Sequence, residues 1–153
     1  APHIKKFEDK RTSDFYNTGK DFFLLRYADI LLLYAECLNE EGATAAAVKI
    51  VNEKVRTRAY GGSLPDEYKW DEAMSQTDFR EKIMDERMRE LCFENWRRMD
   101  LLRTGKFVEY INARNRWAKA SGGPKAYQQL FPVPLVEIEQ NENISREDQN
   151  PEF

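Results

Sequence analysis

Three glutamates, Glu86, Glu90 and Glu94, stand four residues apart in the segment "ERMRELCFENWRRMDLLRTG". On a helix this spacing puts the three carboxylates on one face, where paired carboxylates could act as acid and base. Arginines follow three or four residues further on, at positions 89, 97 and 98. Because a nearby guanidinium group favours the ionised carboxylate, the pattern predicts an ion-paired helix face and no catalytic residue.

Other catalytic and metal-binding patterns are missing from the sequence. The only histidine, His3, stands in the polar lead-in, and this argues against Ser-His-Asp triads, Cys-His dyads and histidine-based metal sites. There is no Cys-x-x-Cys motif, no calcium-binding loop and no glycine-rich phosphate loop. We therefore expect neither an enzyme nor a bound cofactor or metal.

The composition is that of one compact domain. The 153 residues are 41% apolar and 33% charged, and 24 basic against 27 acidic residues give a net charge of −3. The helix expected from Asp78 carries equal numbers of acids and bases, so no nucleic-acid partner is expected. The apolar runs are far shorter than the roughly 20 residues that span a bilayer. Cys37 and Cys92 are read either as two buried thiols or as a disulfide between helices.

The first half of the chain predicts a helical hairpin. After an extended lead-in over residues 1–21, a helical pattern runs from Phe22 to about Glu40, breaks at Gly42 and resumes from Ala45 to Ala59. This hairpin (22–59) has the spacing of a tetratricopeptide repeat, with the small residues Ala35 and Ala47 where the helices approach. A single hairpin cannot bury its own face, so it must lean on further structure.

The second half predicts further helices (78–117) between long ordered loops. Residues 60–76 read as a loop; a helix opens at Asp78, with Glu81 completing a capping box, and its pattern stops at Gly105. A shorter helix follows from Lys106 to Trp117, and prolines keep the tail (128–153) from long helix or central strand. The fold class is all-α. The expected buried side of the Asp78 helix consists of Phe79, Ile83, Met84, Met88, Leu91 and Cys92.

Aromatic residues in the loops are the candidate ligand contacts. Aromatic rings stack on flat apolar faces, and sugar rings offer such faces with hydroxyl groups around the rim. From their loop positions and expected exposure, we predict ligand binding by Tyr68, Trp70, Trp117 and Tyr127.

Five blocks together resemble the SusD/RagB family. They are "LLRYADILLLYAECLNE", the helix with Val55-Arg56 and Arg58-Ala59, "ERMRELCFENWRRMDLLRTG", "LFPVP" and the final "QNPEF", in this order. The resemblance implies that residues 1–153 are the C-terminal domain of a longer surface lipoprotein of Gram-negative outer membranes. Its lipid anchor would lie in upstream sequence. Such proteins capture glycans for a TonB-dependent, SusC-like transporter without catalysis, so the expected partners are an oligosaccharide and that transporter.

The resemblance also implies a structural role for the charged segment. Its charged residues are expected to form a partly buried ion-pair network of Glu86, Arg87, Glu90, Arg97, Asp100 and Arg103. Asn95 stands where the family often has glycine, which asparagine can replace if the backbone is left-handed. The alternative function is a protein-interaction module in which the hairpin docks a partner helix or transporter without binding sugar.

Overall fold

The computed structural model describes residues 5–8, 19–21 and 23–153, and the chain divides into two compact units at Glu90 and Leu91. The described residues form helices, turns and loops and no strand, which confirms the all-α class. Among them, no helix has the length and apolar character needed to cross a bilayer. His3 lies outside the described residues.

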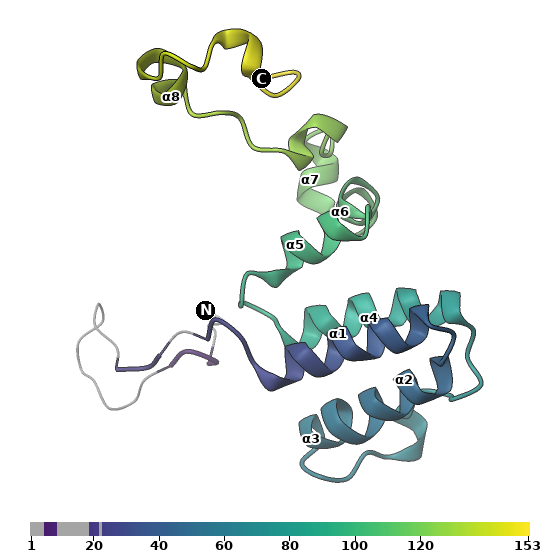
Figure 1. Ribbon diagram of the computed structural model, residues 1–153. Helices are drawn as coiled ribbons and strands as arrows, with labels where there is room; N and C mark the ends of the chain where they lie inside the picture. Colours follow the sequence, from purple (N-terminus) through teal and green to yellow (C-terminus); the bar gives the residue numbers. More distant parts are fainter. Residues whose placement is uncertain (1–4, 9–18, 22) are drawn as a thin grey trace. The chain divides into compact units, whose positions relative to one another are not determined.

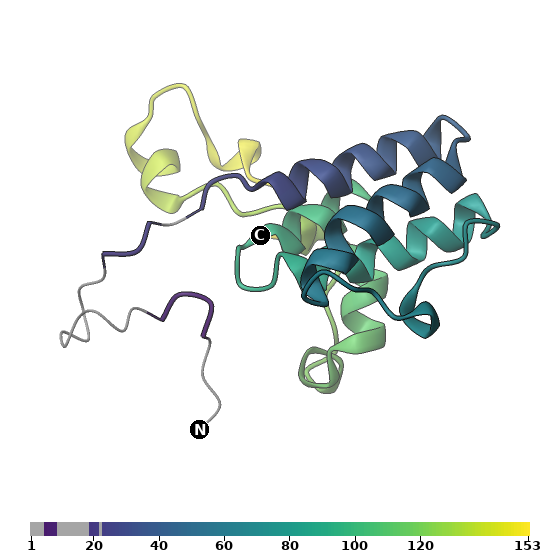
Figure 2. The same ribbon diagram turned by 90° about the horizontal axis from the view of Figure 1, so that it is seen from below.

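The first unit is built from three main helices that pack together (Figures 1 and 2). Its helical segments are α1 (Tyr27–Glu40), α2 (Thr44–Ile50), the π-helical η1 (Val51–Arg56), α3 (Thr57–Ala59), the 3-10 helix η2 (Asp66–Tyr68) and α4 (Gln76–Glu90). The three main helices are α1, the continuous run of α2, η1 and α3, and α4. Gly42 turns the chain between α1 and α2 with a φ of 83°, which glycine adopts without strain. The predicted close approach is confirmed, since Ala35 and Ala47 are fully buried.

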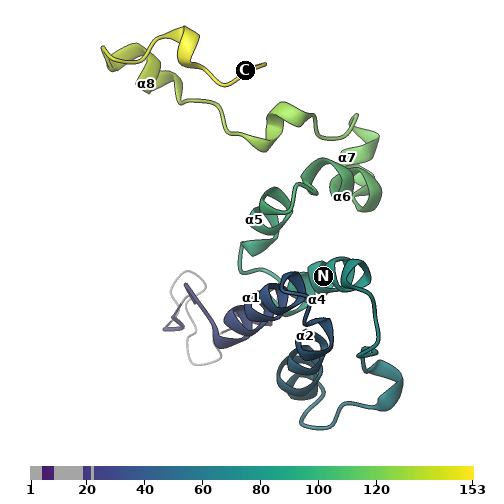
Figure 3. The same cartoon turned by 45° about the vertical axis from the view of Figure 1, so that its right-hand side comes forward.

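Helix α4 supplies the surface on which the hairpin leans (Figure 3). It runs antiparallel to α1, because Asn39 bonds Gln76 at one end and Arg26 bonds Glu90 at the other. Phe79 of α4 joins the core between the helices. The buried core consists of Leu32, Ala35, Ala47, Val48, Val51, Val55, Trp70, Phe79 and Ile83.

The hairpin differs from the prediction at its start and in the helical type of its second half. Helix α1 begins at Tyr27 and not at Phe22, which lies outside the described residues, because the backbone of Arg26 is extended and no side chain caps the helix there. The apolar sequence pattern therefore extends to Leu24 and Leu25, which precede the helix and whose side chains are exposed. The second helix reaches Ala59 as predicted, through a π-helical stretch that the sequence did not indicate.

Helix α4 also starts and ends earlier than predicted. Ser75 forms the N-terminal box with Asp78, accepting from the Asp78 N–H at 3.0 Å and donating to its carboxylate at 2.8 Å, so the predicted Asp78–Glu81 box is wrong. The helix ends at Glu90 instead of continuing toward Gly105, because Phe93 and Asn95 have positive φ. The left-handed backbone expected for Asn95 is confirmed, at φ 65°.

The early end of α4 changes which side chains are buried. Phe79, Ile83, Met84 and Leu91 are buried as predicted, but Met88 and Cys92 are exposed. Cys92 is exposed because it lies in the turn beyond the helix, where the helical period no longer applies. Cys37 is exposed as well, and the two cysteines form no disulfide, so both readings of the cysteines are wrong.

The second unit contains shorter helices. They are α5 (Trp96–Arg103), α6 (Phe107–Arg114), α7 (Arg116–Ala120), the 3-10 helix η3 (Ala126–Gln129), α8 (Leu135–Gln140) and the 3-10 helix η4 (Arg146–Asp148). Phe107 and Tyr110 of α6 are buried. Asn115 interrupts the predicted helix, since its side chain accepts from the N–H groups of Trp117 and Ala118 and starts α7.

Candidate functional site

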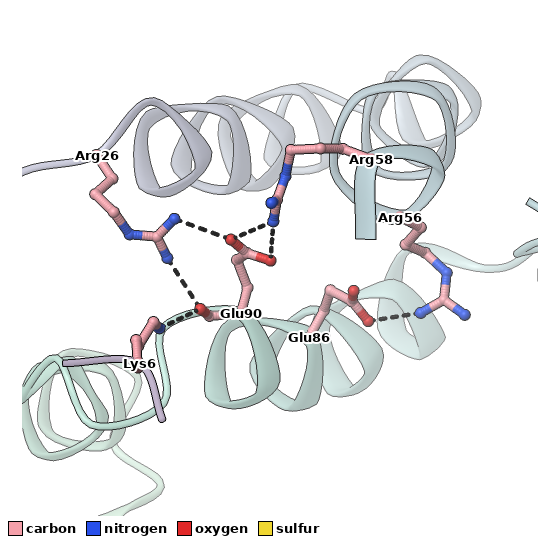
Figure 4. Close-up of polar contacts among 6 residues, drawn as sticks. All are labelled: Lys6, Arg26, Arg56, Arg58, Glu86 and Glu90. Carbon is pink, nitrogen blue, oxygen red and sulfur yellow. Dashed lines mark hydrogen bonds and ion pairs between the residues drawn. The ribbon is translucent and has the colours of Figure 1, made fainter. Parts of the chain in front are cut away.

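Two of the three spaced glutamates lie on one face of α4 and face a row of guanidinium groups (Figure 4). The Glu86 carboxylate accepts from Arg56 at 2.6 Å and from Arg89 at 2.9 Å. The Glu90 carboxylate accepts from Arg26 at 3.0 Å and from Arg58 at 2.8 Å. Each carboxylate is therefore held by two guanidinium groups.

The backbone at the end of α4 is part of the same cluster. The carbonyl oxygen of Glu90 accepts from Arg26 at 2.9 Å and from Lys6 at 3.0 Å. These two cations satisfy a carbonyl that the helix end would leave without a partner. Their positive charges also interact favourably with the negative end of the helix dipole. Figure 4 shows both side chains pointing to this carbonyl. The cluster thus ties the start of α1 and the N-terminal segment to α4.

This geometry is that of an ion-pair cluster and not of an acid–base pair. An acid–base pair needs one carboxyl group in surroundings that keep it protonated next to another kept ionised. Glu86 and Glu90 instead have equivalent surroundings, each with two cationic partners. Glu94, the third glutamate of the row, lies beyond the end of α4 in a turn of the second unit.

Members of the predicted structural network make contacts within each of the two units, and a single network of all six residues stays a prediction. In the first unit Arg87 and Asp29, each 1% exposed, form an ion pair at 2.7 Å. In the second unit Arg103 binds Asp100 at 2.9 Å, and the guanidinium group of Arg97 lies 5.3 Å from the ring centre of Tyr110.

The sequence pattern missed most of the partners of these charges. Four of them lie 30 to 64 positions from the α4 residue they bind, and they are Arg26, Asp29, Arg56 and Arg58. A spacing rule along one helix cannot find partners on another helix. The available signal was the presence of charged residues within the apolar hairpin pattern, which indicates paired charges facing another element.

The predicted aromatic contacts of the first unit differ in exposure. Tyr68 is exposed and stacks on Tyr60, with ring centres 5.2 Å apart. Trp70 is only 7% exposed, so the prediction that its side chain is exposed is wrong. Its ring packs against Phe79, and its backbone N–H and C=O both bond the side chain of Asn52. Trp70 therefore anchors the long loop to the core.

The predicted aromatic contacts of the second unit lie close to a pocket of about 570 Å³. Trp117 is 72% exposed on α7, where its neighbour Ala118 lines this pocket. Tyr127 is half-buried and packs edge-to-face on Phe153, which also lines the pocket. Binding of a ligand by these aromatic residues stays a prediction.

Two hollows flank the ion-pair cluster of the first unit. The first hollow has a volume of about 430 Å³, and its lining includes Arg56, Tyr60, Trp70, Glu86, Arg89 and Glu90. The second hollow, of about 440 Å³, is lined by Arg26, Tyr27, Ala28, Leu31, Lys54 and Arg58. In the part of the chain that the structure describes, no three His, Cys, Asp or Glu side chains come together as a metal site.

Known proteins with similar sequences share a family. The sequence profile of the SusD family matches residues 1–153. SusD-like protein P25 of Formosa agariphila is 34% identical over 134 residues, 87% of this chain and 25% of the relative. SusD-like protein P38 of the same organism is 34% identical over 119 residues, 71% of this chain and 23% of the relative.

A solved structure supports the same assignment. A SusD homolog from Bacteroides thetaiotaomicron matches 86% of this chain and 27% of its own chain, with a TM-score of 0.69 and 30% sequence identity. The chain thus spans about a quarter of the length of the curated relatives it matches. The chain belongs to the SusD family.

Proposed function

We propose that the chain is part of a non-catalytic glycan-binding protein that works at the cell surface beside a TonB-dependent outer-membrane transporter. The observation that carries this proposal is membership of the SusD family, whose profile matches along the full 153 residues. Because the chain covers about a quarter of its relatives, the proposal concerns the share of glycan binding that these residues contribute.

The exposed aromatic residues support a sugar-binding surface. The stacked pair of Tyr60 and Tyr68 offers flat apolar faces to solution, as does the ring of Trp117. Such rings can stack on the apolar faces of sugar rings while neighbouring polar groups bond the hydroxyls. The paired carboxylates of α4 support a binding role without turnover, since neither is arranged as a general acid.

Calorimetric titration with a panel of oligosaccharides tests this function. We expect saturable heat with the parent chain and a roughly tenfold weaker affinity after Tyr68→Ala or Trp117→Ala. Tyr34→Ala is the matched control, because Tyr34 is 52% exposed on α1 and Tyr68 is 48% exposed in the loop. A folded chain that gives no heat with any sugar would contradict the proposal.

A second function, docking of a partner helix, is favoured by one face of α1. Tyr27, Ile30 and Tyr34 are exposed there at spacings of three and four residues, which is the pattern of a helix-packing face. A partner helix on this face would make binding sensitive to Tyr34→Ala and indifferent to Tyr68→Ala. The same pair of variants therefore separates the two functions.

A further inference from the structure

The basic and aromatic surface over the two hollows of the first unit has features that neutral sugar binding does not require. Five cationic side chains line the hollows, and they are Arg26, Lys54, Arg56, Arg58 and Arg89. Two carboxylates, Glu86 and Glu90, oppose them within these linings. Since the whole chain has a net charge of −3, this excess of positive charge is a local feature.

Two ion pairs of Glu90 connect the linings of the two hollows. Glu90 lines the first hollow, while its partners Arg26 and Arg58 line the second. An extended ligand can therefore follow both hollows by passing over Arg58. Figure 4 shows Arg58 reaching across from the end of the hairpin to Glu90 on α4.

The outer guanidinium groups are available to a ligand from solution. The side chains of Arg58 and Arg89 are 60% and 55% exposed, whereas those of the carboxylates they bind are 8% and 7% exposed. Arg58 and Arg89 contact these carboxylates through Nη2. A guanidinium group has five N–H donors, so each can bind a second anion while it keeps its ion pair.

An exposed tyrosine lines each hollow. Tyr60 lines the first hollow and stacks on Tyr68, and the exposed Tyr27 lines the second hollow. Aromatic faces beside guanidinium groups suit a ligand that combines apolar ring faces with negative groups. Uronic-acid and sulfated oligosaccharides have this chemistry.

We propose that the two hollows form one binding site for an anionic oligosaccharide, with Arg58 and Arg89 binding its carboxylate or sulfate groups. This inference rests on the proposed glycan-binding function and adds the charge class of the ligand. Tyr60 and Tyr27 supply the stacking faces for its sugar rings. The inner arginines Arg26 and Arg56 keep the buried carboxylates paired while the outer ones engage the ligand.

The test compares matched ligands on the parent chain and on Arg58→Gln and Arg89→Gln. The carboxylate ligand is an oligogalacturonate and its neutral counterpart is the methyl ester; a dextran sulfate oligomer and unmodified dextran form the sulfate pair. In Arg58→Gln the carboxylate of Glu90 keeps its ion pair with Arg26, and in Arg89→Gln the carboxylate of Glu86 keeps its ion pair with Arg56. The fold is therefore retained in both variants. Arg80→Gln is the control, since Arg80 is also a surface arginine paired with a glutamate.

We expect one or both anionic ligands to bind more tightly than their neutral partners, and the affinity to fall as salt is raised. Arg58→Gln and Arg89→Gln should each weaken binding about tenfold, as expected for the loss of one charge-assisted contact. Arg80→Gln should change nothing. Whichever of the two pairs shows the effect identifies the anionic group as carboxylate or sulfate.

Other outcomes overturn the inference in distinguishable ways. Equal binding of neutral and anionic ligands, or equal loss in Arg80→Gln, refutes the anionic site and leaves glycan binding intact. A single-stranded oligonucleotide that binds more tightly than either glycan refutes the assignment to a sugar. Heat with none of the ligands refutes both the site and the proposed function.

Discussion

At the scale of single residues, the buried ion pair between Arg87 and Asp29 is the most consequential contact. Both side chains are 1% exposed, and they lie on the two helices that the first unit packs together. The Arg87 guanidinium group also lies 3.7 Å from the carboxylate of Glu36, and removal of Arg87 leaves the buried charge of Asp29 without this guanidinium group. This pair therefore makes the packing of α1 on α4 dependent on both residues.

Arg87→Ala is expected to lower the free energy of unfolding by about 3–5 kcal/mol, the usual effect of breaking a buried ion pair. Urea denaturation followed by circular dichroism measures this change. Arg80→Ala is the control, because the Arg80–Glu40 pair is exposed on both sides and should contribute little. Equal losses in the two variants would show that burial of the Arg87 pair is unimportant.

The pair of Arg80 and Glu40 has its own signature in the titration of Glu40. The hydrogen bond donated by Arg80 lowers the pKa of Glu40 below its ordinary value of 4.5. The stability from this pair is present above about pH 4.5 and is lost as pH falls through the lowered pKa. Arg80→Gln should return the pKa of Glu40 toward 4.5 in an NMR titration; an unchanged pKa would contradict the contact.

At the scale of elements, Asn52 of η1 holds the Trp70 end of the long loop after the hairpin. The Asn52 side chain donates to the Trp70 carbonyl at 2.9 Å and accepts from its N–H at 3.0 Å, both buried. Trp70 in turn fills part of the core, so Asn52 fixes where the loop enters it. The carbonyl oxygen of Tyr68, two residues earlier, accepts from Arg56 of the same element at 2.8 Å.

Asn52→Ala should therefore loosen the loop without unfolding the helices. The two backbone groups of Trp70 would lose their buried partners, a penalty of about 1–3 kcal/mol for local opening. Hydrogen exchange at the Trp70 amide should accelerate, and Asn115→Ala, which removes a cap in the second unit, should leave it unchanged. Equal protection of Trp70 in parent and Asn52→Ala would contradict the anchoring role.

The elements themselves were largely predictable from local patterns. The hairpin followed from the spacing of apolar residues and from the small residues Ala35 and Ala47, which the structure places in the core. The start of α1 was not predictable in this way, because the apolar residues before Tyr27 continue the pattern without a cap. The break after Glu90 depends on the positive φ of Phe93, a residue type that gives no such signal.

The candidate site was predictable only in part. The α4 carboxylates were correctly expected to be ion-paired, but their hairpin partners are distant in sequence. The burial of Trp70 could not be seen from a loop-like sequence, since it depends on the contact with Asn52. Local spacing reports neighbours on one helix, whereas a site assembled from three elements is set by tertiary packing.

At the scale of the whole molecule, this SusD family chain has a surface of charged and aromatic residues on its first unit. The buried ion pairs stabilise the packing of that unit, while the outer arginines and tyrosines face solution. We therefore propose that the buried charges stabilise this unit, while the outer arginines and tyrosines bind the ligand without turnover.

The most direct measurement is a calorimetric titration with oligogalacturonate, followed by recovery of the ligand and assay of its reducing ends. We predict saturable heat, a weaker affinity in Arg58→Gln, and recovery of the intact oligosaccharide. New reducing ends would contradict a non-catalytic role. An absence of heat from the folded chain with oligogalacturonate, and with dextran sulfate in its place, would contradict glycan binding at this surface.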